Sequence, residues 1–354
     1  MKKFLALVMA MMMVLAMGTA FAATNDGSKM DASVDTNVIK ITKVYKAAND
    51  DMTSPAETFN FTIENVSVTE SSDVMTVSTM PTPEVGSITV GAGAATTAGA
   101  TFELDVTLPK YDYVGIYTYK IQETNGHLAG VDYFGEDADT EYITLVVTVI
   151  EENGKKMIAA VHCENPVSPS YATDSKKTDR FENVYEAADI TIGKTVTGQF
   201  GDQSKYFDVT VTLTGDASET YLPIAITGGT NSSNVKSIVV NGDSVVLKIK
   251  HGETITLENV PYDVQYTVVE ADYTDNATVE ENKLGYDAAI YNGDDINAAS
   301  DKGTVDSASE DVEITNNKGG NIDTGITMDN APYMMIMAMV VLAGAAMMMK
   351  RRAY

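Results

Sequence analysis

The sequence predicts an all-β protein built from tandem β-sandwiches, and three observations support this prediction. Many short segments alternate between apolar and polar residues, which is the period of a half-buried strand. Valine, threonine and tyrosine are plentiful and tryptophan is absent, so the composition favours strands. No segment shows a sustained helical period, and polar turns separate the alternating segments. Many short strands joined by polar turns are typical of sandwiches.

The clearest alternation predicts four strands and one turn signal predicts a hairpin. The four strands are expected at 58–68, 142–152, 206–215 and 253–260. The stretch SIVVNGDSVVLKIKHGE, residues 237–253, predicts a β-hairpin because Asn241-Gly242 favours a tight turn. The small-residue stretch 91–100 predicts a loop.

The two ends of the chain predict export and membrane retention. Residues 1–22 resemble a signal peptide, with Lys2 and Lys3 before an apolar run and a small-x-small cleavage site at 20–22. An uncleaved N-terminal anchor is the alternative. The apolar run 331–349 is long enough to span a bilayer, and the basic tail 350–354 favours the cytoplasmic side. We therefore expect a secreted protein at the cell surface, whose precursor is held at the membrane by a transmembrane segment.

Charge and composition exclude several functions. The net charge of −26 argues against nucleic-acid binding, which needs a basic surface. The three histidines are scattered and no glycine-rich phosphate loop follows a strand, so we expect no conventional enzyme and no cofactor. The acidic stretches 134–141 and 291–297 lack the spacing of a calcium loop, and no metal is expected. Cys163 is the single cysteine, so no intramolecular disulfide can form, and it is expected to be a small, half-buried strand residue.

The exported part repeats loosely. Three segments recur in the same order: IKITKVYK (39–46) with ITIGKTVTG (190–198), YTYKIQE (117–123) with YTVVE (266–270), and RFENVYE (180–186) with EITNNK (313–318). The repeat predicts two related domains, 32–187 and 188–317, followed by a linker at 318–330.

Each repeated segment places one polar residue among apolar residues on the same strand face, because residues two apart share a face. The six residues are Lys43, Glu123 and Asn183 in the first half and Lys194, Glu270 and Asn316 in the second. Lys40 and Lys46 are alternatives to Lys43, although alternation puts them on the opposite face. Asn317 is an alternative to Asn316. Taken singly, such residues have ordinary explanations. A lysine of this kind usually extends its ammonium group to water, an asparagine usually lies at a sheet edge, and a glutamate can begin a loop.

A lysine, a glutamate and an asparagine in an apolar core can form an amide crosslink. Burial lowers the pKa of a lysine, and the neutral amine is a nucleophile. The asparagine carboxamide is its electrophile. A buried glutamate stays protonated, polarises the carboxamide and carries a proton to the departing ammonia. The product is a neutral amide, which removes the cost of burying the charge.

With these segments, the chain resembles the Gram-positive pilin proteins built from isopeptide-linkage domains, of the streptococcal major pilin type. The resemblance implies that each domain is an immunoglobulin-like β-sandwich whose first and last strands are joined by an isopeptide bond. It implies a bond from Lys43 to Asn183 assisted by Glu123. In the second domain it implies a bond from Lys194 to Asn316 assisted by Glu270.

The segment NIDTGITMDNAP, residues 321–332, resembles a cell-wall sorting signal when taken with the apolar run and basic tail. The resemblance implies that a sortase cleaves between Thr324 and Gly325. The usual Leu-Pro is replaced by Asn321 and Ile322, which departs from the common pattern. A simple membrane anchor is the alternative.

Polymerisation would need an exposed lysine that accepts the Thr324 acyl group, and the polar stretch before Asn183 offers Lys176 or Lys177. We expect a structural pilus shaft subunit whose partners are sortase, neighbouring pilin subunits, cell-wall peptidoglycan and, before sorting, the membrane. A wall- or membrane-anchored adhesin that never polymerises is the alternative. The only chemistry expected is a single intramolecular turnover per domain.

Overall fold

The computed structural model describes most of the chain between the two expected end segments. The described residues are 20–21, 29–72, 74–134, 141–164, 179–230, 234–293, 300–306 and 309–320. Their regular structure is β-strand apart from one 3-10 turn, Glu280–Asn282, which confirms the all-β prediction. The rest of the expected signal peptide, the expected transmembrane segment and its basic tail lie outside them. Within the described part of the chain, no helix has the length and hydropathy to cross a membrane.

Two sheets form the first sandwich. The larger sheet has the order β1 (Ala20–Phe21), β11 (Lys155–Glu164), β10 (Ile143–Glu152), β8 (Gly115–Thr124), β4 (Glu57–Thr69) and β6 (Ser87–Val90), with β2 (Met30–Asp31) also on β11. The smaller sheet has the order β5 (Glu84–Val85), β7 (Ala100–Leu108), β3 (Asn37–Ala47), β12 (Arg180–Tyr185) and β9 (Val131–Asp132). The first and last long strands, β3 and β12, are parallel neighbours.

The second sandwich repeats this plan. One sheet has the order β16 (Ser237–Ile238), β15 (Ile224–Gly228), β18 (Thr254–Pro261), β13 (Ala187–Thr197), β22 (Glu310–Asn317) and β20 (Ile290–Tyr291). The other has the order β17 (Val245–Ile249), β14 (Phe207–Thr214), β19 (Gln265–Glu270) and β21 (Asp301–Thr304). Its first and last strands, β13 and β22, are again parallel neighbours.

Alternation along the strands builds most of both cores, although β3, β10 and β12 each contain consecutive buried residues. In β8 every second residue from Gly115 to Glu123 is buried, and the intervening residues are half-exposed. The first core is rich in tyrosine and phenylalanine, whereas the second is mainly valine, isoleucine and leucine. Ala187 belongs to the first core and Ala188 to the second, so one continuous stretch of chain passes from one core into the other.

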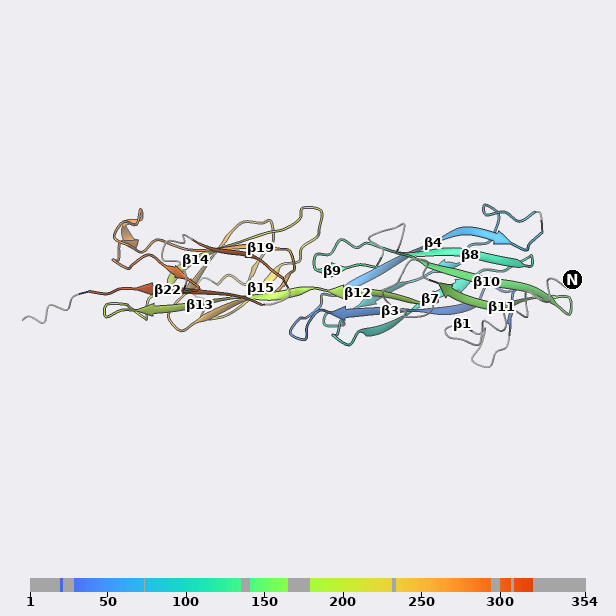
Figure 1. The fold of residues 1–354 in the computed structure, drawn as a ribbon, viewed down its shortest axis with the longest axis horizontal. Helices are drawn as coiled ribbons and strands as arrows, with labels where there is room; N and C mark the ends of the chain where they lie inside the picture. Colours follow the sequence, from blue (N-terminus) through green and yellow to red (C-terminus); the bar gives the residue numbers. More distant parts are fainter. Residues whose placement is uncertain are drawn as a thin grey trace, which may run out of the picture.

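Figure 1 shows the two sandwiches lying end to end, connected by the run from β12 into β13. The loop before β9 touches the second sandwich, because Thr220 donates to the His127 carbonyl at 2.7 Å and Ala129 donates to the Thr220 carbonyl at 3.0 Å. Gly130 is required at this junction, since a Cβ there would lie 2.8 Å from the Glu186 carbonyl oxygen. These contacts hold the two sandwiches together in addition to the covalent connection.

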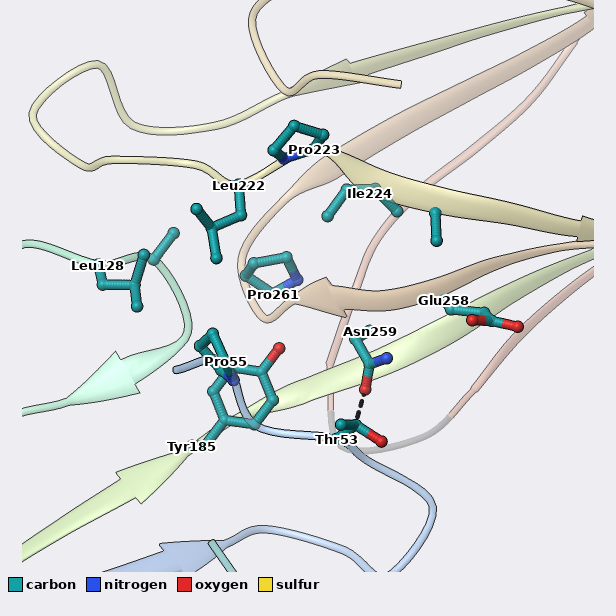
Figure 2. A pocket seen from close by; sticks show the side chains of 12 residues that line it. Thr53, Pro55, Leu128, Tyr185, Leu222, Pro223, Ile224, Glu258, Asn259 and Pro261 are labelled. Atoms are coloured by element: carbon teal, nitrogen blue, oxygen red, sulfur yellow. Dashed lines mark hydrogen bonds between the residues drawn. The ribbon is translucent and has the colours of Figure 1, made fainter. Parts of the chain in front are cut away.

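A small cleft lies on the same junction (Figure 2). Leu128, Leu222, Pro223 and Pro261 give it an apolar lining. On its rim the backbone amide of Thr53 donates to the side-chain oxygen of Asn259 at 2.7 Å, which ties the first sandwich to the second.

The prediction of a β-hairpin at 237–253 is wrong. β16 pairs with β15 in one sheet, whereas β17 pairs with β14 in the other. Asn241 does form the expected turn, with φ of 60°, but the turn carries the chain between the sheets. The Asn241 side chain accepts a hydrogen bond from the Gly215 amide, which fixes the crossing. Cys163 is also more buried than expected, with 1% of its surface exposed.

Candidate functional site

The parallel pairing of β3 and β12 brings Lys43 and Asn183 to one inward face. Lys43 lies opposite Phe181 in the register, and Asn183 is two residues further along β12. Glu123 approaches from β8 in the facing sheet. All three side chains are buried, so the structure brings together the three residues that the sequence singled out in the first half.

Glu123 connects the lysine and the asparagine. Lys43 Nζ donates to Glu123 Oε2 at 2.5 Å, and Asn183 Nδ2 donates to Glu123 Oε1 at 2.6 Å. The backbone amide of Phe134 donates to Asn183 Oδ1 at 2.8 Å. The carboxamide is therefore held by the carboxyl group on its nitrogen side and by a backbone donor on its oxygen side.

Burial dominates the electrostatics of this group. It lowers the pKa of Lys43 to about 8, against the opposing charge of Glu123. Burial also raises the pKa of Glu123, and the hydrogen bonds from Lys43 and Asn183 offset only part of this rise. Both shifts favour a neutral amine beside a neutral carboxylic acid, which are the protonation states of a nucleophile and its acid partner.

The second sandwich holds the equivalent group at the same strand offset. Lys194 lies opposite Ile314 in β22, and Asn316 is again two residues further along. Lys194 Nζ lies 2.8 Å from Glu270 Oε1 and donates to Asn316 Oδ1 at 2.5 Å. All three side chains are buried, and burial lowers the pKa of Lys194 and raises that of Glu270.

An aromatic ring supports each lysine. The Nζ atom of Lys43 lies 4.5 Å from the ring centroid of Phe59, and Lys194 Nζ lies at the same distance from Phe207. Such rings attract an ammonium group while excluding water. Sequence reasoning missed both rings, although each lies at or near the start of its strand, β4 or β14, on the buried face.

The alternatives named from the sequence lie elsewhere. The Lys40 side chain is 55% exposed and pairs with Glu103. Lys46 pairs with Glu182. Asn317 is half-buried and donates to Asp287. The other named residues, Lys176, Lys177, Asn321, Ile322, Thr324 and Gly325, lie outside the described residues.

Two further hydrogen-bonding groups of the two centres could not be predicted from the sequence. One is the backbone amide of Phe134, and a backbone donor cannot be recognised from the type of its side chain. The other is Tyr291, whose hydroxyl oxygen accepts a hydrogen bond from the Glu270 amide at 2.8 Å. The packing of Phe134 against Phe181, with ring centroids 5.2 Å apart, holds the Phe134 amide at Asn183.

A known family model matches the part of the chain that contains Lys43, Glu123 and Asn183. The model of the Spy0128-like isopeptide containing domain matches residues 39–186. The match spans nearly the whole of the expected first domain. A domain of unknown function (DUF7601) matches residues 188–318, the segment that holds the second lysine, glutamate and asparagine.

Most of the chain, and not only one domain, is similar to known pilins. The chain is homologous to the Pilin of Streptococcus pyogenes serotype M1, 26% identical over 341 residues that cover 94% of this chain and 96% of the relative. The crystal structure of the major pilin from Streptococcus pyogenes matches at 21% identity with a TM-score of 0.45, covering 81% of this chain and 100% of that one. The T3.2 major pilin of the same species matches at 19% identity with a TM-score of 0.46, covering 80% and 99%.

Proposed function

We propose that this chain is the shaft subunit of a surface pilus, in which each of two domains, 32–187 and 188–317, is closed by a Lys–Asn isopeptide bond. One observation carries the proposal. A buried lysine, glutamate and asparagine occur twice, with the same two-residue offset between the parallel first and last strands. The homology to a streptococcal pilin along most of the chain supports it.

In the first domain the reaction begins with a proton transfer across the 2.5 Å contact from Lys43 to Glu123. The free amine attacks Cγ of Asn183, and negative charge develops on Oδ1. The Phe134 amide already donates to this oxygen and stabilises the charge.

Collapse of this intermediate completes the crosslink. Glu123 takes the second proton from Nζ and gives its own to Nδ2, with which it is already hydrogen-bonded. The Nζ–Cγ bond forms, the Cγ–Nδ2 bond breaks and one ammonia leaves. Glu123 ends as a neutral acid beside a neutral amide, so no unpaired charge remains buried.

The second domain uses Lys194, Glu270 and Asn316 in the same roles. Lys194 Nζ contacts both the acid that takes its proton and the carboxamide that it attacks. Each bond joins the first and last strands of its domain, β3 with β12 and β13 with β22.

Intact mass measures the crosslinks directly. We expect the purified exported chain to weigh less than its sequence by the mass of one ammonia per domain. Digestion should give two branched peptides, one joining Lys43 to Asn183 and one joining Lys194 to Asn316. A mass equal to that of the sequence would contradict the proposed chemistry.

Assembly is the second part of the proposal. The expected membrane segment would retain the precursor beside a sortase, which would cleave after Thr324 and pass the acyl group to an amine. The amine of a neighbouring subunit, from Lys176 or Lys177, would give a pilus shaft. An amine of the peptidoglycan would instead anchor a single subunit to the wall.

Peptide mapping of surface material distinguishes these outcomes. We expect Thr324 as the new C-terminus, in amide linkage to Lys176 or Lys177, and the loss of everything from Gly325 onward. Replacing Lys176 and Lys177 together by arginine should abolish covalent multimers and keep both intramolecular bonds. If Thr324 occurs only on wall peptide, the chain is a non-polymerising adhesin, and an intact 325–354 segment would exclude sortase processing.

A further inference from the structure

The glutamate of the second centre lies where its strand has lost one neighbour. β19 pairs with β14 as far as Glu270, and the amide of the next residue, Ala271, donates to the Asp208 carbonyl at 2.9 Å. Hydrogen-bonded and non-hydrogen-bonded pairs alternate along an antiparallel ladder, so the Glu270 amide points away from β14. On that other side, the described register of β21 reaches only to Val268 of β19. The Glu270 amide therefore lies beyond the end of the neighbouring strand.

Tyr291 supplies a hydrogen-bond acceptor for this amide from the facing sheet. Its hydroxyl oxygen accepts the Glu270 amide at 2.8 Å, and both side chains are buried. Tyr291 lies in β20 opposite Ile314 of β22, and Ile314 lies opposite Lys194 of β13. These three residues form one row across the sheet that carries both reacting side chains. Tyr291 therefore ties the backbone of Glu270 to the sheet that holds its two reaction partners.

Asn292 fixes the position of Tyr291. Its backbone amide donates to the Glu313 carbonyl at 2.9 Å, and its side-chain oxygen accepts a hydrogen bond from the Glu313 amide at 2.7 Å. Its side-chain nitrogen donates to Asp301 of β21 at 2.7 Å. These bonds hold the end of β20 both to β22 and to the facing sheet, so the Tyr291 hydroxyl has a defined place beside Glu270.

The proposed reaction depends on the distance that this tie restrains. Glu270 has to take a proton from Lys194 and give one to the leaving nitrogen of Asn316, and both steps need hydrogen-bond contact. Glu270 lies on β19, whereas Lys194 and Asn316 lie on β13 and β22 in the other sheet. The 2.8 Å contact between Lys194 Nζ and Glu270 Oε1 therefore crosses the sandwich. A hydrogen bond that joins the two sheets at Glu270 itself keeps this contact short.

The corresponding strand of the first domain contributes to its centre in a different way. β9 lies on the outer side of the last strand β12 as β20 lies on the outer side of β22, and both pairs are antiparallel. The chain leaving β9 places the Phe134 amide on the Asn183 carboxamide, whereas β20 places a hydroxyl on the glutamate backbone. This edge strand therefore positions the electrophile in the first domain and the acid–base residue in the second.

We propose that Tyr291 is a positioning residue for the second crosslink, whose hydroxyl holds Glu270 against Lys194 through the Glu270 backbone. This inference rests on the proposed crosslinking function. Tyr291 takes no proton and forms no covalent bond in the reaction, and it acts only through Glu270.

The rate of crosslink formation in the full chain tests this role. The chain is synthesised in a cell-free system, captured in denaturant before it folds, and diluted into folding buffer. The two branched peptides, one joining Lys43 to Asn183 and one joining Lys194 to Asn316, are then quantified against time by mass spectrometry. The first crosslink serves as the internal control in every variant.

Tyr291→Phe removes the hydroxyl and keeps the ring. We expect the second crosslink to form about three- to tenfold more slowly, the effect of losing one hydrogen bond that holds the reactive geometry, and the first to keep its wild-type rate. Tyr286→Phe is the matched control. The Tyr286 hydroxyl accepts the Asp202 amide at 3.0 Å, so this variant loses the same kind of contact in the same domain at a residue outside the centre. It should form both crosslinks at wild-type rates.

Protease resistance of chains that also contain Asn316→Ala separates positioning from folding, because no second crosslink can form in them. We expect Tyr291→Phe and Tyr286→Phe to retain most of the resistance of the Asn316→Ala chain. Three results would overturn this inference: a wild-type rate in Tyr291→Phe, equal slowing by Tyr286→Phe, or loss of protease resistance caused by Tyr291→Phe in this background. A wild-type chain that forms no second crosslink would instead overturn the proposed function.

Discussion

Glu123→Ala should abolish the Lys43–Asn183 bond and leave the Lys194–Asn316 bond intact. Glu123 is the acceptor for both Lys43 and Asn183, so its loss removes the base that frees the amine and the acid that releases ammonia. General acid–base catalysis of this kind contributes about 10²–10⁴-fold, enough to separate complete from negligible crosslinking during folding. Compared with the mass calculated for this variant with both crosslinks, the intact mass should be higher by one ammonia, and the first branched peptide should disappear.

The matched controls for this prediction lie in the same protein. Glu270→Ala should give the mirror result, with only the second bond lost. Glu103→Ala removes an exposed carboxylate that pairs with Lys40 on the other face of the smaller sheet, and both bonds should still form. If both crosslinks persist in the Glu123→Ala, Glu270→Ala double variant, the catalytic assignment is wrong.

The lysine, glutamate and asparagine could be predicted because strand alternation assigns each residue to a face. Lys43 and Lys194 each share a strand face with isoleucines of the same strand. The two-residue period that places those isoleucines in the core therefore also predicts that the lysines are buried. The same three residue types occur in the same order in both halves of the chain. This repetition indicated a reaction centre and argued against a chance arrangement. The tandem-sandwich prediction rests on the same alternation, repeated in many short segments.

Features that depend on long-range pairing could not be predicted. Asn241-Gly242 makes a turn, but whether the flanking strands pair with each other depends on β15 and β14, which lie elsewhere in the chain. The Phe134 amide reaches Asn183 across 49 positions. Glu57 resembles an ordinary solvated charge at the start of a strand, and only the packing against Tyr133 shows that it is partly buried.

Asn316→Ala should cause a large loss of stability. The bond from Lys194 to Asn316 closes a loop across 122 positions. By the chain-entropy relation used for disulfides, a crosslink that closes a loop of this size contributes about 5 kcal/mol to the free energy of unfolding. The variant should keep the fold of the second domain, because Lys194 retains Glu270 as its partner. Its denaturant midpoint should fall well below that of the crosslinked protein, and protease should cleave the second domain first.

Asn317→Ala is the control for this prediction, because Asn317 is adjacent in β22 and was the sequence-level alternative to Asn316. Its side chain donates to Asp287 on the partly exposed side of the strand. Losing that contact should cost about 1 kcal/mol, the typical net value of a hydrogen bond, and the second crosslink should persist. Asn316 and Asn317 are adjacent in an alternating strand, so their side chains lie on opposite faces. The two variants therefore test which face carries the carboxamide that forms the crosslink. A bond lost in Asn317→Ala and retained in Asn316→Ala would reverse the assignment, and equal small losses of stability in both would show that no crosslink closes the second domain.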